Sequence, residues 1–287
     1  MTTLLISPDG MLGRAFAEAL GAAGQGGFEG VLYPDLDLTK EETIARAVRP
    51  GITRVINCAA YTDVDGAEAN EPLATAINGT GVGALARRCR EVGAALVHFG
   101  TDYVFDGASS RPYPISAPLA PQGAYGRSKA LGETLIRESG AEHLYVRTSW
   151  LYAPWAKNFV RTIASLARTK DQLRVVDDQR GRPTSAEHLV RGTLALFERG
   201  MRGTWHVTDG GECTWFGLAR EIVRLTAAQH PGTACVVEPC TTAEFPRPAP
   251  RPAYSVLDLS ETESVLGPMP DWRMNLADVM SRLEPWS

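Results

Sequence analysis

The stretch TTLLISPDGMLGRAFAEALGA, residues 2–22, decides the fold of this chain. Residues 2–7 form a short apolar run that is typical of a buried strand, and residues 8–10, Pro-Asp-Gly, form a tight turn. Residues 11–22 are apolar and rich in alanine, which favours a helix. A strand, a turn and a helix in this order are the first unit of an alternating β/α fold.

The alternation continues along the first half of the chain. We predict strands at residues 31–33, 54–57, 94–100 and 143–149, and helices at 39–49, 73–92 and 125–139. The helix near residue 40 is expected to open on a capping box, because Thr39 precedes Glu42 by three positions. Strands that alternate with helices are joined by right-handed crossovers, so the sequence predicts an α/β fold with a Rossmann-type, doubly wound parallel sheet.

The alternation of strands and helices becomes less regular after Trp150. We predict helices at 159–168 and 185–199, a strand at 174–176, and an extended or turned segment at 239–252, which holds five prolines. We therefore expect residues 1–150 to form a dinucleotide-binding domain, with parts of 184–210 returning to it. Residues 151–287 are expected to form mainly a smaller, C-terminal substrate-binding lobe.

The bulk composition excludes several classes of protein. A net charge of −4 over 287 residues argues against a broad nucleic-acid footprint, which needs a basic surface. No run of about 18 apolar residues predicts a membrane span, and the first residues lack a signal-peptide pattern. The five cysteines form no CxxC pair and have no histidine at zinc-ligand spacing. We expect a cytoplasmic protein with free thiols and no metal site.

The first turn is a candidate phosphate-binding site. Gly10 and Gly13 match the last two glycines of a G-x-x-G-x-x-G turn, which lets the backbone approach a pyrophosphate, whereas Ser7 replaces the first glycine. A tight turn with close helix packing is the structural alternative. Because Pro8 disfavours helical angles in the residue before it, we expect Ser7 to be extended and the turn to be rebuilt.

An acidic residue near the end of the second strand could hold the ribose hydroxyls of a dinucleotide. Asp35 lies at about the ~20-residue offset that such sites use, and Asp37 competes with it. Either aspartate could instead be a solvated loop residue or a helix cap. If one of them accepts from the ribose, NADH should be favoured over NADPH, although Arg14, next to Gly13, argues for a 2′-phosphate.

The strongest local signal is the run Tyr125-Gly126-Arg127-Ser128-Lys129, a Y-x-x-x-K pattern on a predicted helix. A spacing of four places both side chains on one helix face. An ammonium beside a phenol favours tyrosinate and lowers the phenol pKa, so the tyrosine could exchange a proton with a carbonyl or alcohol. The alternative is a surface lysine beside a half-buried tyrosine.

A second polar element follows the predicted strand at 94–100. The hydroxyl of Thr101 would lie at the carboxyl edge of the sheet, where it could donate to the same carbonyl that Tyr125 protonates. By itself, a Thr-Asp pair after a strand is more often a turn or a cap. The two elements together predict a site that polarises a carbonyl and transfers a proton to its oxygen.

The chain resembles the dTDP-4-dehydrorhamnose reductase family of extended short-chain dehydrogenases. The segments that carry the resemblance are TDYVFDG (101–107), YGRSKALGE (125–133) and RTSWLY (147–152), together with NCAAYTDVD (57–65), AIN (76–78) and GRPT (181–184). Gly100, Ser7 and Pro8 depart from the family pattern, which often has a serine at the first of these positions and a glycine at the second. The match covers about residues 1 to 260.

The resemblance implies roles for individual residues. Tyr125 would be the proton donor, Lys129 its partner and a ribose ligand, and Thr101 the hydrogen-bond donor to the carbonyl. The sugar site would be lined by Thr101, Asp102, Tyr103 and Trp150. The dinucleotide would contact Gly10, Met11, Leu12, Asp37, Leu38, Ala60, Tyr61 and Thr62. For Trp150, the alternative is an ordinary core aromatic residue.

The implied reaction is reduction of the C4 keto group of a dTDP-4-keto-6-deoxyhexose by NADH or NADPH, with no metal. The leading substrate is dTDP-4-dehydro-L-rhamnose, and a 4-keto sugar of an antibiotic pathway is the second interpretation. A third is a non-catalytic partner protein, since the family includes regulatory subunits of methionine adenosyltransferase. The sequence leaves the oligomeric state open, a homodimer included.

Overall fold

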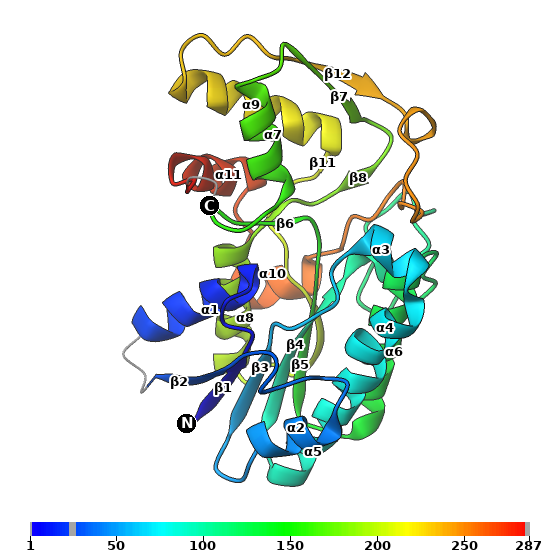
Figure 1. Cartoon of the computed structure of the whole chain (residues 1–287), viewed down its shortest axis with the longest axis vertical. Coiled ribbons are helices and arrows are strands. Elements are labelled where there is room, and N and C mark those ends of the chain that lie inside the picture. The colour runs from blue at the N-terminus through cyan, green and yellow to red at the C-terminus, as the bar shows by residue number, and fades with distance from the viewer. Residues whose placement is uncertain (1, 23–26, 285–287) are drawn as a thin grey trace.

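The computed structural model describes residues 2–22 and 27–284 and is built on a six-stranded parallel sheet (Figure 1). The strands are β1 (Thr3–Ile6), β2 (Phe28–Val31), β3 (Arg54–Asn57), β4 (Ala95–Thr101), β5 (His143–Thr148) and β10 (Gly203–His206). Their order is β10-β5-β4-β3-β1-β2, so the chain winds outward in both directions from the β1/β3 pair. The predicted Rossmann-type, doubly wound α/β class is confirmed.

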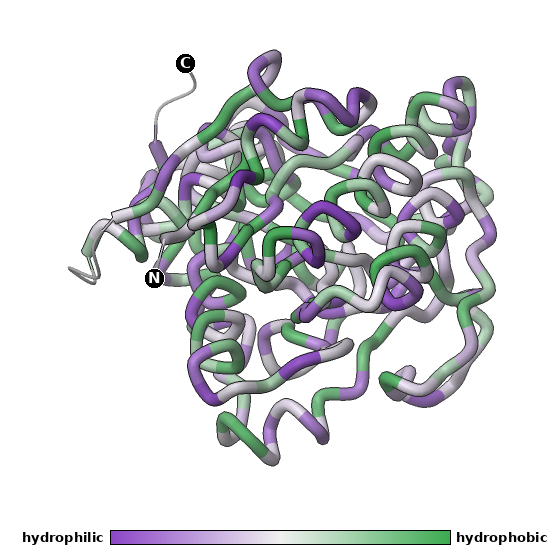
Figure 2. Tube along the Cα trace, turned by 90° about the horizontal axis from the view of Figure 1, so that it is seen from below, coloured by the Kyte–Doolittle hydropathy of each residue, from purple (hydrophilic) through white to green (hydrophobic). Residues whose placement is uncertain are grey.

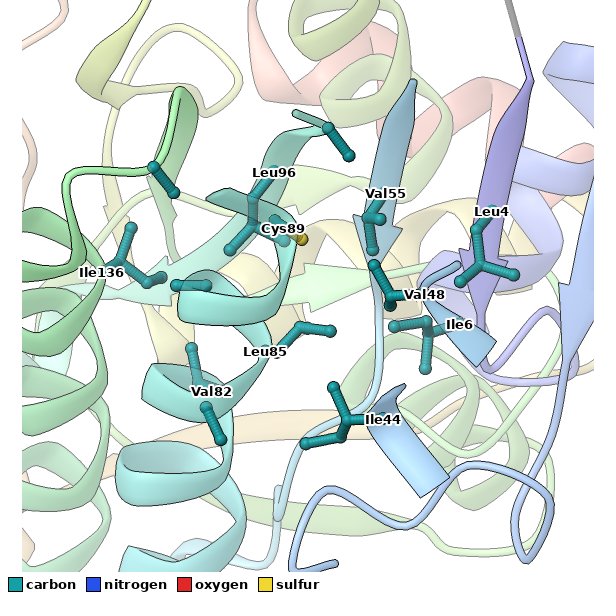
Figure 3. Close-up of a cluster of buried hydrophobic side chains, with 14 of the residues drawn as sticks. Leu4, Ile6, Ile44, Val48, Val55, Val82, Leu85, Cys89, Leu96 and Ile136 are labelled. Carbon is teal, nitrogen blue, oxygen red and sulfur yellow. The ribbon is translucent and has the colours of Figure 1, made fainter. Parts of the chain in front are cut away.

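Helices cover both faces of the sheet. On one face, α1 (Met11–Ala22) packs beside α8 (Ala186–Glu198). On the other face lie α2 (Glu41–Ala47), α5 (Val82–Val92) and α6 (Ala124–Ser139). Figure 3 shows the core on this second face, where the labelled aliphatic side chains of the strands and helices interlock. Hydrophobic and hydrophilic segments alternate along the tube in Figure 2, as they do in amphipathic elements.

A smaller lobe lies beyond the carboxyl ends of the sheet strands (Figure 1). Its own apolar core lies between α7 (Phe159–Ala167), α9 (Trp215–Gln229) and α11 (Trp272–Ser281). Beside them, β7 (Gln172–Val176) pairs with β12 (Val236–Cys240). Two further short pairs are β6 (Leu151–Tyr152) with β9 (Thr184–Ser185) and β8 (Arg180–Gly181) with β11 (Cys213–Thr214). Between β9 and β11 in the chain, α8 and β10 return to the central sheet, and α10 (Ser260–Leu266) packs against both.

The predicted helix at 73–92 is interrupted. It consists of α4 (Glu71–Thr75), a π-helical turn η1 (Ala76–Gly81) and α5, and it is preceded by the short α3 (Val64–Ala69). A Cβ on Gly132 of α6 would lie 2.1 Å from the carbonyl oxygen of Asn78 in η1. The wide turn therefore brings its backbone into direct contact with α6, which a side chain at residue 132 would prevent.

The expectation for Ser7 is wrong. Its φ is 57°, in the left-handed region, although Pro8 follows it. Two backbone hydrogen bonds hold it there: its N–H donates to the Val31 oxygen at 2.9 Å, and its oxygen accepts from Gly10 N–H at 3.2 Å. The pairing of β1 with β2 and the closure of the turn together outweigh the local cost of a Cβ at positive φ, about 1–2 kcal/mol.

The expected capping box at Thr39 is also wrong. Helix α2 begins at Glu41 with Lys40 as its N-cap, and no side chain caps it. The backbone N–H and the hydroxyl of Thr39 instead both donate to Asp37 Oδ1, at 2.9 and 2.7 Å. The local Asx-type turn at Asp37 thus takes the donors that a capping box would have used.

No helix among the described residues is long and apolar enough to cross a membrane.

Candidate active site

The predicted site residues lie in the segments that follow five neighbouring strands. Because parallel strands end at the same edge, these segments meet beyond the carboxyl ends of the sheet, facing the smaller lobe (Figure 1). After β1 come Gly10, Met11 and Leu12; after β2, Asp35, Asp37 and Leu38; after β3, Ala60, Tyr61 and Thr62; at the end of β4 and beyond it, Thr101, Asp102 and Tyr103; after β5, Trp150. Tyr125 and Lys129 project from α6.

Lys129 lies on the buried face of α6, with 4% of its surface exposed. Its Nζ donates to the backbone oxygen of Phe99 in β4 at 2.6 Å. Burial disfavours the charged form and lowers the pKa of this ammonium to about 8. This hydrogen bond therefore fixes the Lys129 side chain to β4, the strand that ends at Thr101.

Tyr125 is half-buried and packs edge-on against Tyr103, with ring centroids 6.0 Å apart. Burial, followed by the charge of Asp102, raises the pKa of the phenol to about 12, and a hydrogen bond to Thr101 acts in the opposite direction. The expectation that Lys129 lowers this pKa is wrong for the protein alone, because desolvation dominates. A phenol that stays protonated at neutral pH is the form that can donate a proton.

Thr101 and Asp102 are buried side by side at the end of β4. The Thr101 hydroxyl donates to Asp102 Oδ1 at 3.1 Å and accepts from the Tyr103 N–H at 3.2 Å. Burial raises the pKa of Asp102 to about 6, so its carboxyl titrates just below neutrality. A ligand oxygen would have to compete with Asp102 for the Thr101 proton.

A cavity of about 250 Å³ opens beside Tyr125. Its lining includes Tyr103 and Tyr125, residues 249–252 of the proline-rich segment, and Ala253, which follows that segment. This segment is tied down by Asp65 of α3, whose carboxylate contacts Arg247 at 2.7 Å and Arg251 at 2.9 Å. The sequence predicted an extended proline-rich segment but not that it forms a wall of the site. A second cavity, of about 490 Å³ between α7, α9 and α11, contains none of the predicted site residues.

Trp150 has a φ of 47° and lies against two other residues. Its ring stacks on Trp215 with centroids 3.6 Å apart, and a Cβ on Gly181 would lie only 2.6 Å from the indole. These two close contacts fix the position of the indole. Trp215, which no sequence signal marked, joins the smaller lobe to this edge of the sheet.

The first turn fits a dinucleotide pyrophosphate. A Cβ on Gly13 would lie 1.8 Å from the Ser7 backbone oxygen, so the chain can fold this closely only around a glycine. The amides of Met11 and Leu12, in the first turn of α1, have no acceptor within the helix and lie at its positive end. The amides of Met11 and Leu12 are thus the donors that would hold the phosphates, while Gly10, whose N–H donates to Ser7, lets the chain approach them closely.

The two candidate ribose ligands differ in their surroundings. Asp35 is exposed, whereas Asp37 already accepts two hydrogen bonds from Thr39 and lies 3.5 Å from Lys40 Nζ. Arg14, the residue that argued for a 2′-phosphate, is held by Glu18 at 2.9 Å and Glu284 at 2.5 Å. Of the two aspartates, Asp35 is the one whose carboxylate is exposed to solvent.

The loop after β3 is clamped by Asn78 of the π-helical turn. The side chain of Asn78 accepts from the Tyr61 N–H at 2.8 Å and donates to the Tyr61 oxygen at 2.9 Å. Its amide also donates to Ser128 of α6 at 3.1 Å. The loop carrying Ala60, Tyr61 and Thr62 is thereby fixed relative to the helix that carries Tyr125.

In the described ranges, no group of three or more His, Cys, Asp or Glu side chains is arranged to hold a metal ion.

The fold and the site together define a Rossmann-type protein of the short-chain dehydrogenase/reductase class, with a Tyr-x-x-x-Lys centre. The model of one family, the RmlD substrate binding domain, matches residues 1–284. The chain belongs to this family. The resemblance drawn from the sequence motifs is confirmed.

Similar proteins cover nearly the whole chain. A dTDP-4-dehydrorhamnose reductase of Burkholderia thailandensis is 38% identical over 289 residues, with 95% of this chain and 96% of the relative covered. A probable dTDP-4,6-dihydroxy-2-methyloxan-3-one 4-ketoreductase of Streptomyces antibioticus is 39% identical, with 97% and 94% covered. The crystal structure of a Bacillus anthracis dTDP-4-dehydrorhamnose reductase in complex with NADP has a TM-score of 0.89 at 32% identity, with 98% of each chain covered.

Proposed function

We propose that this protein is an NADH- or NADPH-dependent reductase of the C4 keto group of a dTDP-linked 4-keto-6-deoxyhexose. The proposed substrate is dTDP-4-dehydro-L-rhamnose, and the product dTDP-L-rhamnose. The observation that carries the proposal is that Tyr125 lies beside a cavity, interacts with Thr101 at the end of β4, and shares its helix with the buried Lys129. The two reductases and the NADP complex to which the chain is similar support it.

Each of the three residues has a chemical task in this proposal. Reduced nicotinamide, when bound, supplies the hydride. Tyr125 donates its phenolic proton to the substrate oxygen, and its protonated state at neutral pH suits this direction of reaction. Thr101 donates a second hydrogen bond to the same oxygen, after turning from Asp102. Lys129, four positions further along the same helix, would bind the ribose and supply a positive charge on the helix face that carries the phenol.

The remaining site residues divide between cofactor and sugar. The turn at Gly10 and the amides of Met11 and Leu12 would hold the pyrophosphate, while Asp35 or Asp37 would accept from the ribose. Leu38, Ala60, Tyr61 and Thr62 would contact the dinucleotide from the neighbouring loops. Asp102, Tyr103 and Trp150 would contact the sugar. In this division residues 1–150, with α8 and β10, bind the dinucleotide, and most of 151–287 binds the substrate.

The test is turnover of a panel of dTDP-4-keto-6-deoxyhexoses with NADH and with NADPH. The configuration at C4 of each product would be read by NMR. Efficient conversion of dTDP-4-dehydro-L-rhamnose to dTDP-L-rhamnose is expected. Absence of turnover with every 4-keto sugar, from folded protein that binds dinucleotide, would contradict the proposal and favour the non-catalytic partner role.

A second candidate is reduction of another dTDP-4-keto sugar. The Streptomyces antibioticus relative supports it, because its similarity to this chain equals that of the rhamnose-pathway relative within one percentage point. The same panel separates the two candidates. A kcat/KM at least tenfold higher for a different 4-keto epimer would establish the second.

We also propose that the protein works in the cytoplasm. The thiols of Cys58, Cys89, Cys213, Cys235 and Cys240 are all free, which suits a reducing compartment. Light scattering of the purified protein would decide between a monomer and a homodimer, which the sequence leaves open.

A further inference from the structure

The helix that carries Tyr125 has no cap of its own. Its N-cap residue is Gly123, which has no side chain to accept from the free amides of the first turn. The acceptor comes instead from α3, where Glu68 Oε1 accepts from the Ala124 N–H at 2.8 Å. Ala124 directly precedes Tyr125. The bond therefore joins the first residue of α6 to a carboxylate that lies 56 positions earlier in the chain.

The approach of Glu68 depends on the glycine at the N-cap. A Cβ on Gly123 would lie 2.8 Å from Glu68 Oε1, closer than carbon and oxygen normally come. Behind this contact, Ala67, Ala74 and Ala124 form a small buried cluster, against which Tyr61 and Tyr125 pack. Small side chains at these positions bring α3 and α4 close enough for the carboxylate to reach α6.

The carboxylate is well placed electrostatically. It lies at the positive end of a helix of 16 residues, where a negative group is favoured. It also lines the cavity of about 250 Å³, together with Tyr103 and Tyr125. Glu68 and Tyr125 therefore belong to the wall of the same cavity.

A second carboxylate nearby provides a natural comparison. Glu71 of α4 binds Arg127 through two bonds of 2.7 and 2.8 Å, in the same first turn of α6. This pair is exposed, with 40% and 44% of the two side chains accessible, and it lines no part of the cavity. Loss of Glu71 would weaken the same helix end without touching the site.

We propose that Glu68 is a positioning residue for the reaction: it fixes the first turn of α6 and so holds the Tyr125 hydroxyl in register with Thr101 and Lys129. The inference rests on the proposed function, in which Tyr125 donates the proton. Misplacement of a reacting group by about 1 Å can cost roughly a hundredfold in rate. The effect should appear in kcat rather than in KM, because Glu68 holds the helix and not the sugar.

The experiment compares Glu68→Ala, Glu68→Gln, Glu71→Ala and Tyr125→Phe in steady-state turnover, with thermal melting of each variant. We expect kcat of Glu68→Ala to fall about 10–100-fold with KM changed less than threefold. Glu68→Gln keeps an acceptor oxygen and should return kcat to within about threefold of wild type. Glu71→Ala should stay within about twofold of wild type.

The outcomes separate the two proposals. A kcat for Glu68→Ala within twofold of wild type, while Tyr125→Phe is inactive, would overturn the role of Glu68 and leave the proposed function standing. Equal losses in Glu68→Gln and Glu68→Ala would also overturn it. An active Tyr125→Phe would overturn both. If Glu68→Ala does not fold, Gly123→Ala tests the same contact, since its Cβ displaces the carboxylate, and it should show the same loss of kcat.

Discussion

Glu133 of α6, the helix that carries Tyr125, and Arg147 of β5 form a buried ion pair that joins the helix to the sheet. Arg147 Nη2 and Nε contact the two carboxylate oxygens at 2.5 and 3.0 Å, and the side chains are 2% and 3% exposed. The guanidinium also donates to the Ile115 oxygen at 3.0 Å and lies 3.1 Å from His206 Nε2. Burial, and then the charge of Arg147, lowers the pKa of His206 to about 3, so this ring is a neutral acceptor.

Removing one member of this pair should destabilise the protein strongly. We expect Glu133→Ala to lower the free energy of unfolding by about 3–5 kcal/mol, because it leaves a buried guanidinium without its counter-ion. Urea unfolding followed by circular dichroism measures it. The matched control is Glu71→Ala, which breaks an exposed pair with Arg127 and should cost less than about 1 kcal/mol. Equal effects in the two variants would show that burial does not decide the cost.

Ser7→Gly should not destabilise the protein and should stabilise it by up to about 1.5 kcal/mol. Relief of the left-handed conformation is worth about 1–2 kcal/mol, and the greater freedom of glycine in the unfolded chain costs about 0.5–1 kcal/mol. Chemical denaturation of both proteins under one set of conditions gives the difference. A loss of stability of more than about 1 kcal/mol would show that the serine side chain makes a favourable contribution at this turn.

Tyr125→Phe should reduce kcat by about 10²–10⁴-fold, because it removes the hydroxyl that supplies the proton. Dinucleotide affinity, measured by fluorescence titration, and the melting temperature should stay close to wild type, since the ring and its packing on Tyr103 remain. A folded variant with more than half of the wild-type kcat would exclude Tyr125 as the acid.

Asp102→Asn should remove a pH-dependent component of stability. The pKa of the Asp102 carboxyl is raised to about 6 in the folded protein, above its unfolded value near 3.9. The folded state therefore holds the proton to higher pH, and wild-type stability falls between about pH 4 and pH 6 and stays low above that. Relative to Asp102→Asn, wild type should lose on the order of 2–3 kcal/mol over this window. Urea unfolding at pH 4, 5, 6 and 7 measures the difference, and a constant difference would contradict the raised pKa.

Asp35→Asn should shift cofactor use towards NADPH. If the exposed Asp35 faces the ribose, removing its charge should raise the NADPH/NADH ratio of kcat/KM by roughly fivefold, the ratio that about 1 kcal/mol between nearby charges in water gives. Arg14→Ala is the control and should leave the ratio unchanged, because Glu18 and Glu284 already hold that guanidinium. A fall in NADPH use on loss of Arg14 would show that the arginine, and not the acid, sets the preference.

Much of the site could be predicted because its chemistry is local in the sequence. The spacing of Tyr125 and Lys129 places both on one face of any helix, and the helix itself follows from residues 125–139. The strand at 54–57 is found at the predicted bounds, and the strand at 143–149 ends one residue earlier. Apolar runs and turn residues define such elements without reference to the rest of the chain.

The alternation of strands and helices, the sheet class and the motif that identifies the family were thus determined by the sequence alone. The second strand, predicted at residues 31–33, lies at Phe28–Val31, because its pairing with β1 sets its bounds. The tertiary structure decided the positive φ of Ser7, the π-helical turn around Asn78, the raised pKa of Tyr125 and the contact between Glu68 and Ala124. Each of these depends on groups far apart in the chain: β2 holds Ser7, α6 packs on the π-helical turn, and burial of the assembled edge desolvates the phenol. Such contacts, and the dielectric around them, exist only once the sheet and its helices have packed together.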